Sequence, residues 1–139
     1  MLKVKALLFD VFGTVVDWRT GIAKEVESIA DKNDISLDPF DFADAWRAEY
    51  QPAMEEIRKG RRSFTILDIL HMENLKKIAP KFNLHNISDE DFKFLVTAWH
   101  RLPGWPDSSE GLNALKKKYI LATQSNGNIA LIVNIPIEI

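Results

Sequence analysis

An aspartate that could attack a substrate lies near the start of the chain. Asp10 follows the apolar run 4–9 and precedes Gly13 and Thr14, which favour a turn. A carboxylate packs poorly directly after a buried strand, so we expect Asp10 to face a crevice or to bind donors. In a crevice it could act as a covalent nucleophile, forming an ester or acyl phosphate that water hydrolyses. The simpler alternative is that Asp10 only accepts N–H bonds from its own loop.

A second polar segment follows a second apolar run. Residues 119–123 are followed by 124–127, which read Gln-Ser-Asn-Gly. By itself, a Ser-Asn-Gly sequence such as 125–127 is common in ordinary turns. If both runs are parallel strands, their carboxyl ends meet at one edge of a sheet, where open α/β folds bind ligands.

Apolar residues recur every three or four positions between the two runs, which is the spacing of amphipathic helices. Many Pro and Gly residues at 102–107 predict a linker. The aromatic residues of the helical segments are expected mainly in the core. The predicted strands cover 4–9 and 119–123, and the predicted helices cover 20–32, 38–60, 63–79, 88–99, 108–117 and 128–134.

Capping residues support several of these helix starts. Asp38 is followed by a proline in the first turn, which is a preferred beginning. Ser88 with Asp91 three residues later resembles a capping box. Ser63 and Asn128 are the caps predicted for the third and the last helix.

The order of the elements predicts an α/β fold with a parallel sheet and a helical insertion after the first strand. Residues 1–17 and 103–139 would form the α/β core, and 18–102 the helical insertion. Two convincing strands are fewer than an average sheet contains, so the core is predicted to be incomplete. The tail 132–139 adds one edge strand at most, because Pro136 limits its pairing.

The composition excludes several kinds of partner. The formal net charge is −2, from 18 basic and 20 acidic residues, so no nucleic-acid partner is expected. The chain contains no cysteine, which excludes disulfides, thiolate zinc sites and thiol nucleophiles. The first apolar run is too short for a signal peptide or a membrane span, so the expected location is the cytoplasm and no membrane partner is expected.

Four segments together resemble the haloacid dehalogenase superfamily. Residues 9–17, which read Phe-Asp-Val-Phe-Gly-Thr-Val-Val-Asp, resemble its first motif, and 125–127 resemble its second. The longer string 9–19, which adds Trp-Arg, looks like the L-2-haloacid dehalogenase branch of the superfamily. The pair at 46–47, Trp-Arg, is similar to a pair on the first long helix of the superfamily's cap domain, and 99–107 look like its return from cap to core. The resemblance implies a Rossmann-like core, with 18–102 as the cap, and a covalent aspartate nucleophile at Asp10.

The residue two positions after the nucleophile suggests the reaction class. Phosphatases of the superfamily carry a second aspartate there as general acid, whereas this chain has Phe12, which cannot transfer a proton. Halide leaves as a stable anion and needs no proton. The sequence is therefore similar to the L-2-haloacid dehalogenases (type II), which convert short (S)-2-haloalkanoic acids to (R)-2-hydroxy acids. A phosphatase-like hydrolase using Asp10 is the alternative enzyme.

The resemblance also implies roles for individual residues. Asp10 would form the ester intermediate, and Thr14 would orient it. Arg47 and Asn126 would receive the halide, because arginine is a planar, permanently charged donor. Alone, Arg47 would be read as a helix-edge arginine whose head reaches water.

The remaining implied contacts concern the substrate carboxylate. Ser125 and the backbone amides of Val11 and Phe12 would hold it. No metal or organic cofactor is implied; the partners are a small 2-haloacid and its halide product. The three histidines do not have metal-ligand spacing, so no metal site is expected at them. They are expected at the surface or partly buried, which is the usual place for histidine; they are His71, His85 and His100.

The sequence departs from the family after the second motif. Full members continue with a lysine near a Lys-Pro sequence and a later strand end bearing Ser, Asn or Asp, and neither follows residue 127 here. We therefore expect a C-terminally truncated member whose activity is weak or absent. The non-catalytic alternative is a binding or dimerising module, and a homodimer would form through the helical cap.

Overall fold

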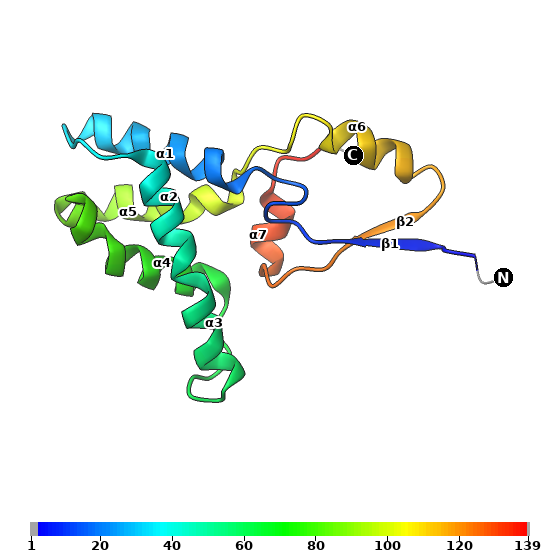
Figure 1. Cartoon of the computed structure of the whole chain (residues 1–139), viewed down its shortest axis with the longest axis horizontal. Helices are drawn as coiled ribbons and strands as arrows, with labels where there is room; N and C mark the ends of the chain where they lie inside the picture. The colour runs from blue at the N-terminus through cyan, green and yellow to red at the C-terminus, as the bar shows by residue number, and fades with distance from the viewer. Residues whose placement is uncertain (1–2, 139) are drawn as a thin grey trace.

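The computed structural model describes residues 3–138 and contains two strands and seven α-helices. Helices α1 to α5 lie together in one group, the helical block, and the strands lie with α6 and α7 in another (Figure 1). The elements are β1 (Ala6–Phe9), α1 (Trp18–Lys32), α2 (Pro39–Ala48), α3 (Tyr50–Arg58), α4 (Leu67–Ile78), α5 (Asp89–Val96), α6 (Ser108–Leu115), β2 (Ile120–Thr123) and α7 (Ile129–Asn134), with short 3₁₀ turns at Ala79–Phe82, Leu84–Asn86 and Thr97–His100.

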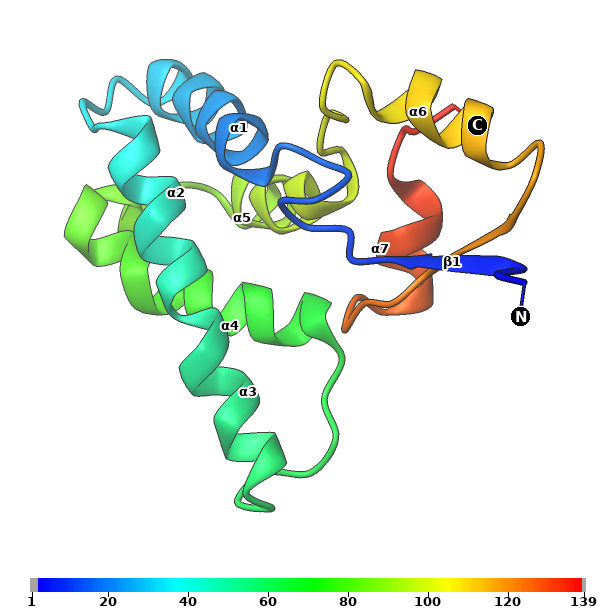
Figure 2. The same cartoon turned by 45° about the vertical axis from the view of Figure 1, so that its right-hand side comes forward.

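The two strands pair in parallel, with Ala6 opposite Ile120 and Phe9 opposite Thr123. The predicted mixed α/β class with a parallel sheet is therefore confirmed. β1 begins two residues later than predicted, and the prediction that it is a buried strand was wrong, since none of its four residues is buried and Leu8 is 64% exposed. A parallel sheet normally has both faces covered. Here α6 lies above the strands in the view of Figure 2, and Leu8 of β1 stays exposed.

The end of the described chain forms no additional strand. After α7, residues 135–138 have no regular structure, and residue 139 lies outside the described residues. Ile132, Ile135 and Ile137 instead line an apolar cavity with Phe9 and Leu121 of the two strands. Residues 135–138 thus lie beside the sheet, next to Phe9 and Leu121, and add no strand to it.

Helix α1 follows the predicted apolar pattern. Its inward face carries Ile22, Val26 and Ile29, all of them buried. It begins two residues earlier than predicted because the Asp17 side chain caps it, accepting a hydrogen bond from the Thr20 amide at 3.1 Å.

The single helix predicted over 38–60 was wrong, because the chain breaks it at Glu49 into α2 and α3. Asp38 caps α2 as predicted, accepting from the amides of Phe40 and Asp41. Pro52 explains the break, since proline lacks the N–H of a helix interior and its ring clashes with the carbonyl four residues earlier, here that of Ala48.

The start predicted for the third helix was also wrong. Helix α4 begins at Leu67, and no side chain caps it. Ser63 lies outside the helix, and the neighbouring Phe64 is exposed rather than in the core. Arg62 fixes this segment by donating to Thr65 and to Glu73 of α4.

The fourth helix begins as predicted and ends early. The hydroxyl of Ser88 accepts a hydrogen bond from the Asp91 amide at 3.1 Å. The Asp91 carboxylate accepts from Lys32 at 2.6 Å and from Asn33, which lowers its pKa. Helix α5 ends at Val96 and a 3₁₀ turn continues the chain, so the predicted end at residue 99 was too late.

Aromatic side chains join the helical block to the loop that follows β1. The ring of Trp99 lies 5.4 Å from that of Trp46, 6.2 Å from that of Trp18 and 6.3 Å from that of Phe12. Such aromatic pairs contribute beyond the area that they bury. Within residues 3–138, no helix is both long and apolar enough to span a membrane.

Replacing Gly21 by alanine is expected to destabilise the protein, although the same change usually stabilises a helix. A Cβ at Gly21 would lie 2.8 Å from Pro103 Cδ and 2.9 Å from the side chain of Leu102, which is fully buried. We expect a loss of about 1–3 kcal/mol in the free energy of unfolding, measured by urea denaturation.

The matched control is Gly111→Ala in α6, where a Cβ would have no neighbour within 4 Å. This variant is expected to gain about 0.5–1 kcal/mol from helix propensity alone. Equal stability of the two variants would contradict the close contact between α1 and the segment at 102–103.

Candidate active site

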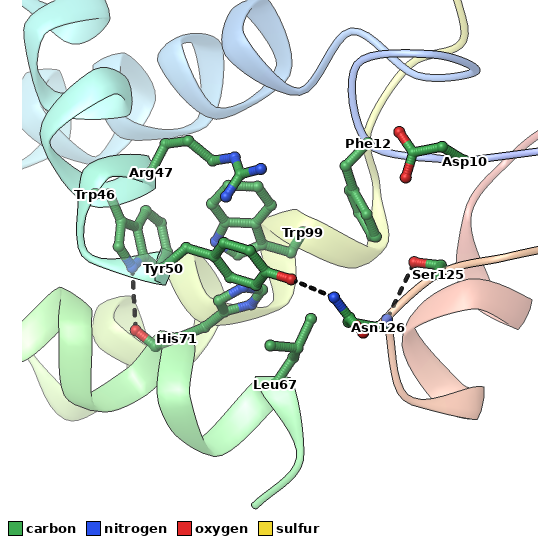
Figure 3. Close-up of a pocket in the computed structure, with 11 residues that line it drawn as sticks. Asp10, Phe12, Trp46, Arg47, Tyr50, Leu67, His71, Trp99, Ser125 and Asn126 are labelled. Atoms are coloured by element: carbon green, nitrogen blue, oxygen red, sulfur yellow. Dashed lines mark hydrogen bonds between the residues drawn. The ribbon is translucent and has the colours of Figure 1, made fainter. Parts of the chain in front are cut away.

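The carboxyl ends of β1 and β2 open onto a pocket of about 100 Å³ between the sheet and the helical block (Figure 3). Asp10 follows β1 and reaches the pocket, as do Ser125 and Asn126 after β2. The parallel register explains why these segments, far apart in sequence, meet at one edge. The lining residues are Asp10, Phe12, Trp46, Arg47, Tyr50, Leu67, His71, Trp99, Ser125, Asn126 and Gly127.

Asp10 is exposed and held by its own loop. The hydroxyl of Thr14 donates a hydrogen bond to Asp10 Oδ2 at 3.1 Å. The loop closes because the Val11 carbonyl accepts from several amides that follow it, and Gly13 has a φ of 100°, which favours glycine. No lysine or arginine among residues 3–138 forms an ion pair with Asp10, so the carboxylate faces the pocket without a counter-charge.

The two amides predicted to bind the substrate carboxylate are available. Neither the Val11 nor the Phe12 N–H donates a hydrogen bond to another described residue. The Phe12 side chain lies between Asp10 and Trp99 (Figure 3). The position two residues after Asp10 therefore presents an aromatic ring to the pocket and no proton donor.

The segment after β2 contacts the helical block. Asn126 Nδ2 donates a hydrogen bond to the hydroxyl of Tyr50 at 2.7 Å, and Ser125 Oγ accepts from the Gly127 amide at 3.1 Å. Tyr50 lies at the start of α3, and its contact with Asn126 joins the two sides of the pocket. The aromatic residues of the helical segments, Tyr50 among them, were expected mainly in the core, and no sequence pattern pointed to this polar contact.

Arg47 lies at the end of α2 and brings an unpaired cation to the pocket. Its guanidinium lies 4.4 Å from the ring centre of Tyr50 and 5.8 Å from that of Trp18. Each of the other five arginines forms an ion pair with a carboxylate. Arg47 has no such partner among residues 3–138. A guanidinium held on aromatic faces without a counter-ion is suited to bind an anion.

His71 belongs to the pocket wall, although no functional role was predicted for it. The side chain is buried, and its ring stacks on Trp99 with 4.6 Å between centres. Burial lowers the pKa of His71 to about 4, an effect that Arg47 and His100 reinforce and Asp68 opposes. His71 is therefore neutral at pH 7. Its position one turn from the buried Leu67 and Leu75 was the sequence signal for its burial.

The other histidines divide between core and surface. His100 is buried, so the expectation of a surface or partly buried position was wrong for it as it was for His71. Its Nε2 contacts Asp68 Oδ1 at 2.9 Å, and its Nδ1 contacts the amide of Asn134 at 3.1 Å. His85 is exposed, as expected.

Asp68 links the helical block to α7. Its second oxygen accepts a hydrogen bond from Asn128 Nδ2 at 3.0 Å. Asn128 is the residue before α7, as predicted, but its side chain makes no cap bond, because it is committed to Asp68. These bonds fix the orientation of the loop that carries Ser125 and Asn126.

The described residues contain no group of three or more His, Cys, Asp or Glu side chains that could hold a metal ion. The polar atoms of the pocket are instead one carboxylate, one guanidinium, hydroxyls, amides and an imidazole. This set can attack a carbon centre and bind anions on two sides of it.

Comparison with solved structures found extensive similarity. The chain is 47% identical to a defluorinating L-2-haloacid dehalogenase, with a TM-score of 0.90 over 94% of this chain and 54% of that one. It is 38% identical to a second L-2-haloacid dehalogenase, with a TM-score of 0.89 over 96% of this chain and 57% of that one.

A more distant structure, the L-2-haloacid dehalogenase of Xanthobacter autotrophicus, shares the fold at 19% identity and a TM-score of 0.76, over 95% of this chain and 50% of that one. The chain therefore spans little more than half the length of these structures. No family model and no curated protein matches the chain.

Proposed function

The chain belongs to the L-2-haloacid dehalogenase family over the part of those enzymes that it spans, and from this premise we propose that it hydrolytically dehalogenates short (S)-2-haloalkanoic acids to (R)-2-hydroxy acids. One observation supports the proposal most strongly. Asp10 and Arg47, two opposite charges that have no ion-pair partner among the described residues, line the same small pocket.

In the first proposed step, an oxygen of Asp10 attacks the carbon that bears the halogen. The new C–O bond forms an ester, the carbon–halogen bond breaks, and the halide leaves with the bonding electrons. Thr14 holds the attacking carboxylate through the bond to Oδ2. The halide departs on the side opposite Asp10, towards Arg47 and Asn126, and the carbon is inverted.

The substrate carboxylate needs a separate site. We assign it to Ser125 and to the amides of Val11 and Phe12, which surround Asp10 and have N–H or hydroxyl groups to donate. The apolar ring of Phe12 lies beside the attacking carboxylate and would help to exclude water once a substrate fills the pocket, which would strengthen the electrostatic interactions there. Phe12 also argues against a phosphatase activity, because a phosphatase needs a proton donor at this position and phenylalanine has none.

In the second proposed step, water attacks the ester carbonyl, which releases the 2-hydroxy acid and restores Asp10. Among the described residues, Asp10 is the only carboxylate that lines the pocket. No second carboxylate is therefore placed to activate the water, and we expect turnover well below the ~10 s⁻¹ of an ordinary enzyme.

We further propose that the two parts of the chain have different roles. Residues 1–17 and 103–139 would act as the core that carries the nucleophile, and 18–102 as a cap that carries Arg47. A homodimer would form through the cap, where Phe64 and Phe94 are exposed.

The test is halide release from each enantiomer of 2-chloropropionate. We expect chloride from the L form alone and none from the Asp10→Asn variant, whereas Asp107→Asn, which changes an exposed aspartate outside the pocket, behaves as the parent chain. Equal release from both enantiomers would contradict the proposal. Magnesium-dependent phosphate release from an aryl phosphate would favour a phosphatase, and silence in both assays would favour a non-catalytic module.

A further inference from the structure

His71 is a fixed side chain with unused hydrogen-bonding groups. It is 5% exposed, its ring stacks on Trp99, and its backbone carbonyl accepts a hydrogen bond from Trp46 Nε1 at 3.1 Å. Its Nδ1 is buried without a partner, and its Nε2 forms no hydrogen bond to a described residue. Buried polar groups in native proteins almost always have partners, so this ring requires an explanation.

The protonation state of His71 defines what it can bind. The ring is neutral at pH 7, because burial disfavours its charged form. A neutral imidazole carries one N–H, which can donate to an anion without adding charge to the pocket. Arg47 lies on the same side of the pocket and supplies the positive charge. The Arg47 guanidinium and the neutral His71 ring therefore lie in the same wall of the pocket. Within residues 3–138, Arg47 has no ion-pair partner and the His71 ring has no hydrogen-bond partner.

The position of this wall indicates which anion it receives. Asp10 comes from the end of β1, whereas His71 and Arg47 come from the helical block on the opposite side of the pocket (Figure 3). In a displacement at saturated carbon, the leaving group departs on the side away from the nucleophile. A halide displaced by Asp10 would therefore arrive at the wall formed by the helical block.

We propose that His71 is a further halide-binding residue, whose ring N–H donates to the halide that Arg47 neutralises. The inference rests on the function proposed above and deepens it. The substrate carboxylate remains on the other side, with Ser125 and the loop amides.

Chloride binding to the intact chain tests the inference without any turnover. Binding is measured by the line width of chlorine-35 NMR at constant ionic strength, with bromide as competitor. His71→Phe keeps an aromatic ring against Trp99 and removes the N–H, and it is expected to weaken chloride binding about tenfold. His71→Gln restores a donor and should recover most of the affinity. His85→Phe, at an exposed histidine, is the matched control and should bind as the parent chain does.

Circular dichroism and thermal unfolding establish that each variant is folded, and His71→Leu replaces His71→Phe if the latter is not. The inference is overturned if the folded variant binds chloride as tightly as the parent, or if the parent shows no broadening that bromide removes. It is also overturned if His71→Phe weakens the binding of propionate and leaves chloride unchanged. A different pair of results would overturn the proposed function alone. In that case the chain binds chloride in a way that depends on His71, but it releases no halide from L-2-chloropropionate.

Discussion

Incubation with L-2-bromopropionate is expected to leave one ester on Asp10 that persists, with about one bromide released per chain before turnover slows. The attack requires only the nucleophile, an anion site for the carboxylate and a site for the halide. The pocket has candidates for all three, at Asp10, at Ser125 and at Arg47. The first half of the reaction is therefore expected to proceed.

The second half needs a base to activate water. Once Asp10 is esterified, the titratable side chains that line the pocket are Arg47, Tyr50 and His71. Arginine and tyrosine are proton donors at neutral pH. His71, with a pKa of about 4, is too weak a base to remove a proton from water efficiently at pH 7. Hydrolysis should therefore be slower than attack, and the ester should accumulate.

Intact-mass spectrometry measures the ester, peptide mapping locates it, and bromide is quantified in parallel. Asp10→Asn should acquire no label, and Asp107→Asn should be labelled as the parent chain is. Steady bromide release without an initial burst would show that hydrolysis is not limiting. A label on any residue other than Asp10 would contradict its assignment as nucleophile.

The second large effect is expected at Arg47. Replacing Arg47 by methionine should slow ester formation by about 10² to 10³-fold, the range found when a single donor to a developing anion is removed. The effect is large because no other arginine can take over: each is paired with a carboxylate. Lysine at this position keeps the charge but loses the planar contact with Tyr50, so its rate should lie between those of the methionine variant and the parent.

The rate is measured by quenched mass spectrometry under single-turnover conditions, with circular dichroism as the check on folding. Arg58→Met is the matched control. Arg58 is an exposed arginine of α3 that pairs with Glu55 and lies outside the pocket. A change in the control as large as that in Arg47→Met would show a general effect of charge. An unchanged rate in Arg47→Met would remove Arg47 from the halide site.

Local patterns in the sequence predicted the parts of the site that lie next to strand ends and helix caps. The run before Asp10 and the run before Ser125 each ended at a polar segment, and the parallel register brought these segments together. Asp38 and Ser88 cap their helices as expected, because a cap depends on residues two or three positions away. Arg47 was identified by its place beside Trp46 in a family motif.

The features that the sequence could not give depend on distant partners. The bond between Tyr50 and Asn126 joins segments that only the folded chain brings together. Ser63 has good capping chemistry, but Arg62 binds Glu73, and residues 63–66 stay outside the helix. His71 lies at helical spacing from Leu67 and Leu75, and this pattern indicates a buried position. Its place in the pocket wall depends on stacking with Trp99, which comes from another element.

The pairing of β1 with β2 has a consequence for how the fold forms. The entire segment 10–119 lies between the two strands, so their pairing closes a very long loop for a ladder of four residue pairs. Helices such as α1 form from contacts close in sequence, which are made earlier and at lower entropic cost. We therefore expect the helical block to assemble before the sheet, and the sheet to open before the helical block does. The meeting of the segments that carry Asp10 and Asn126 thus depends on a ladder of only four residue pairs.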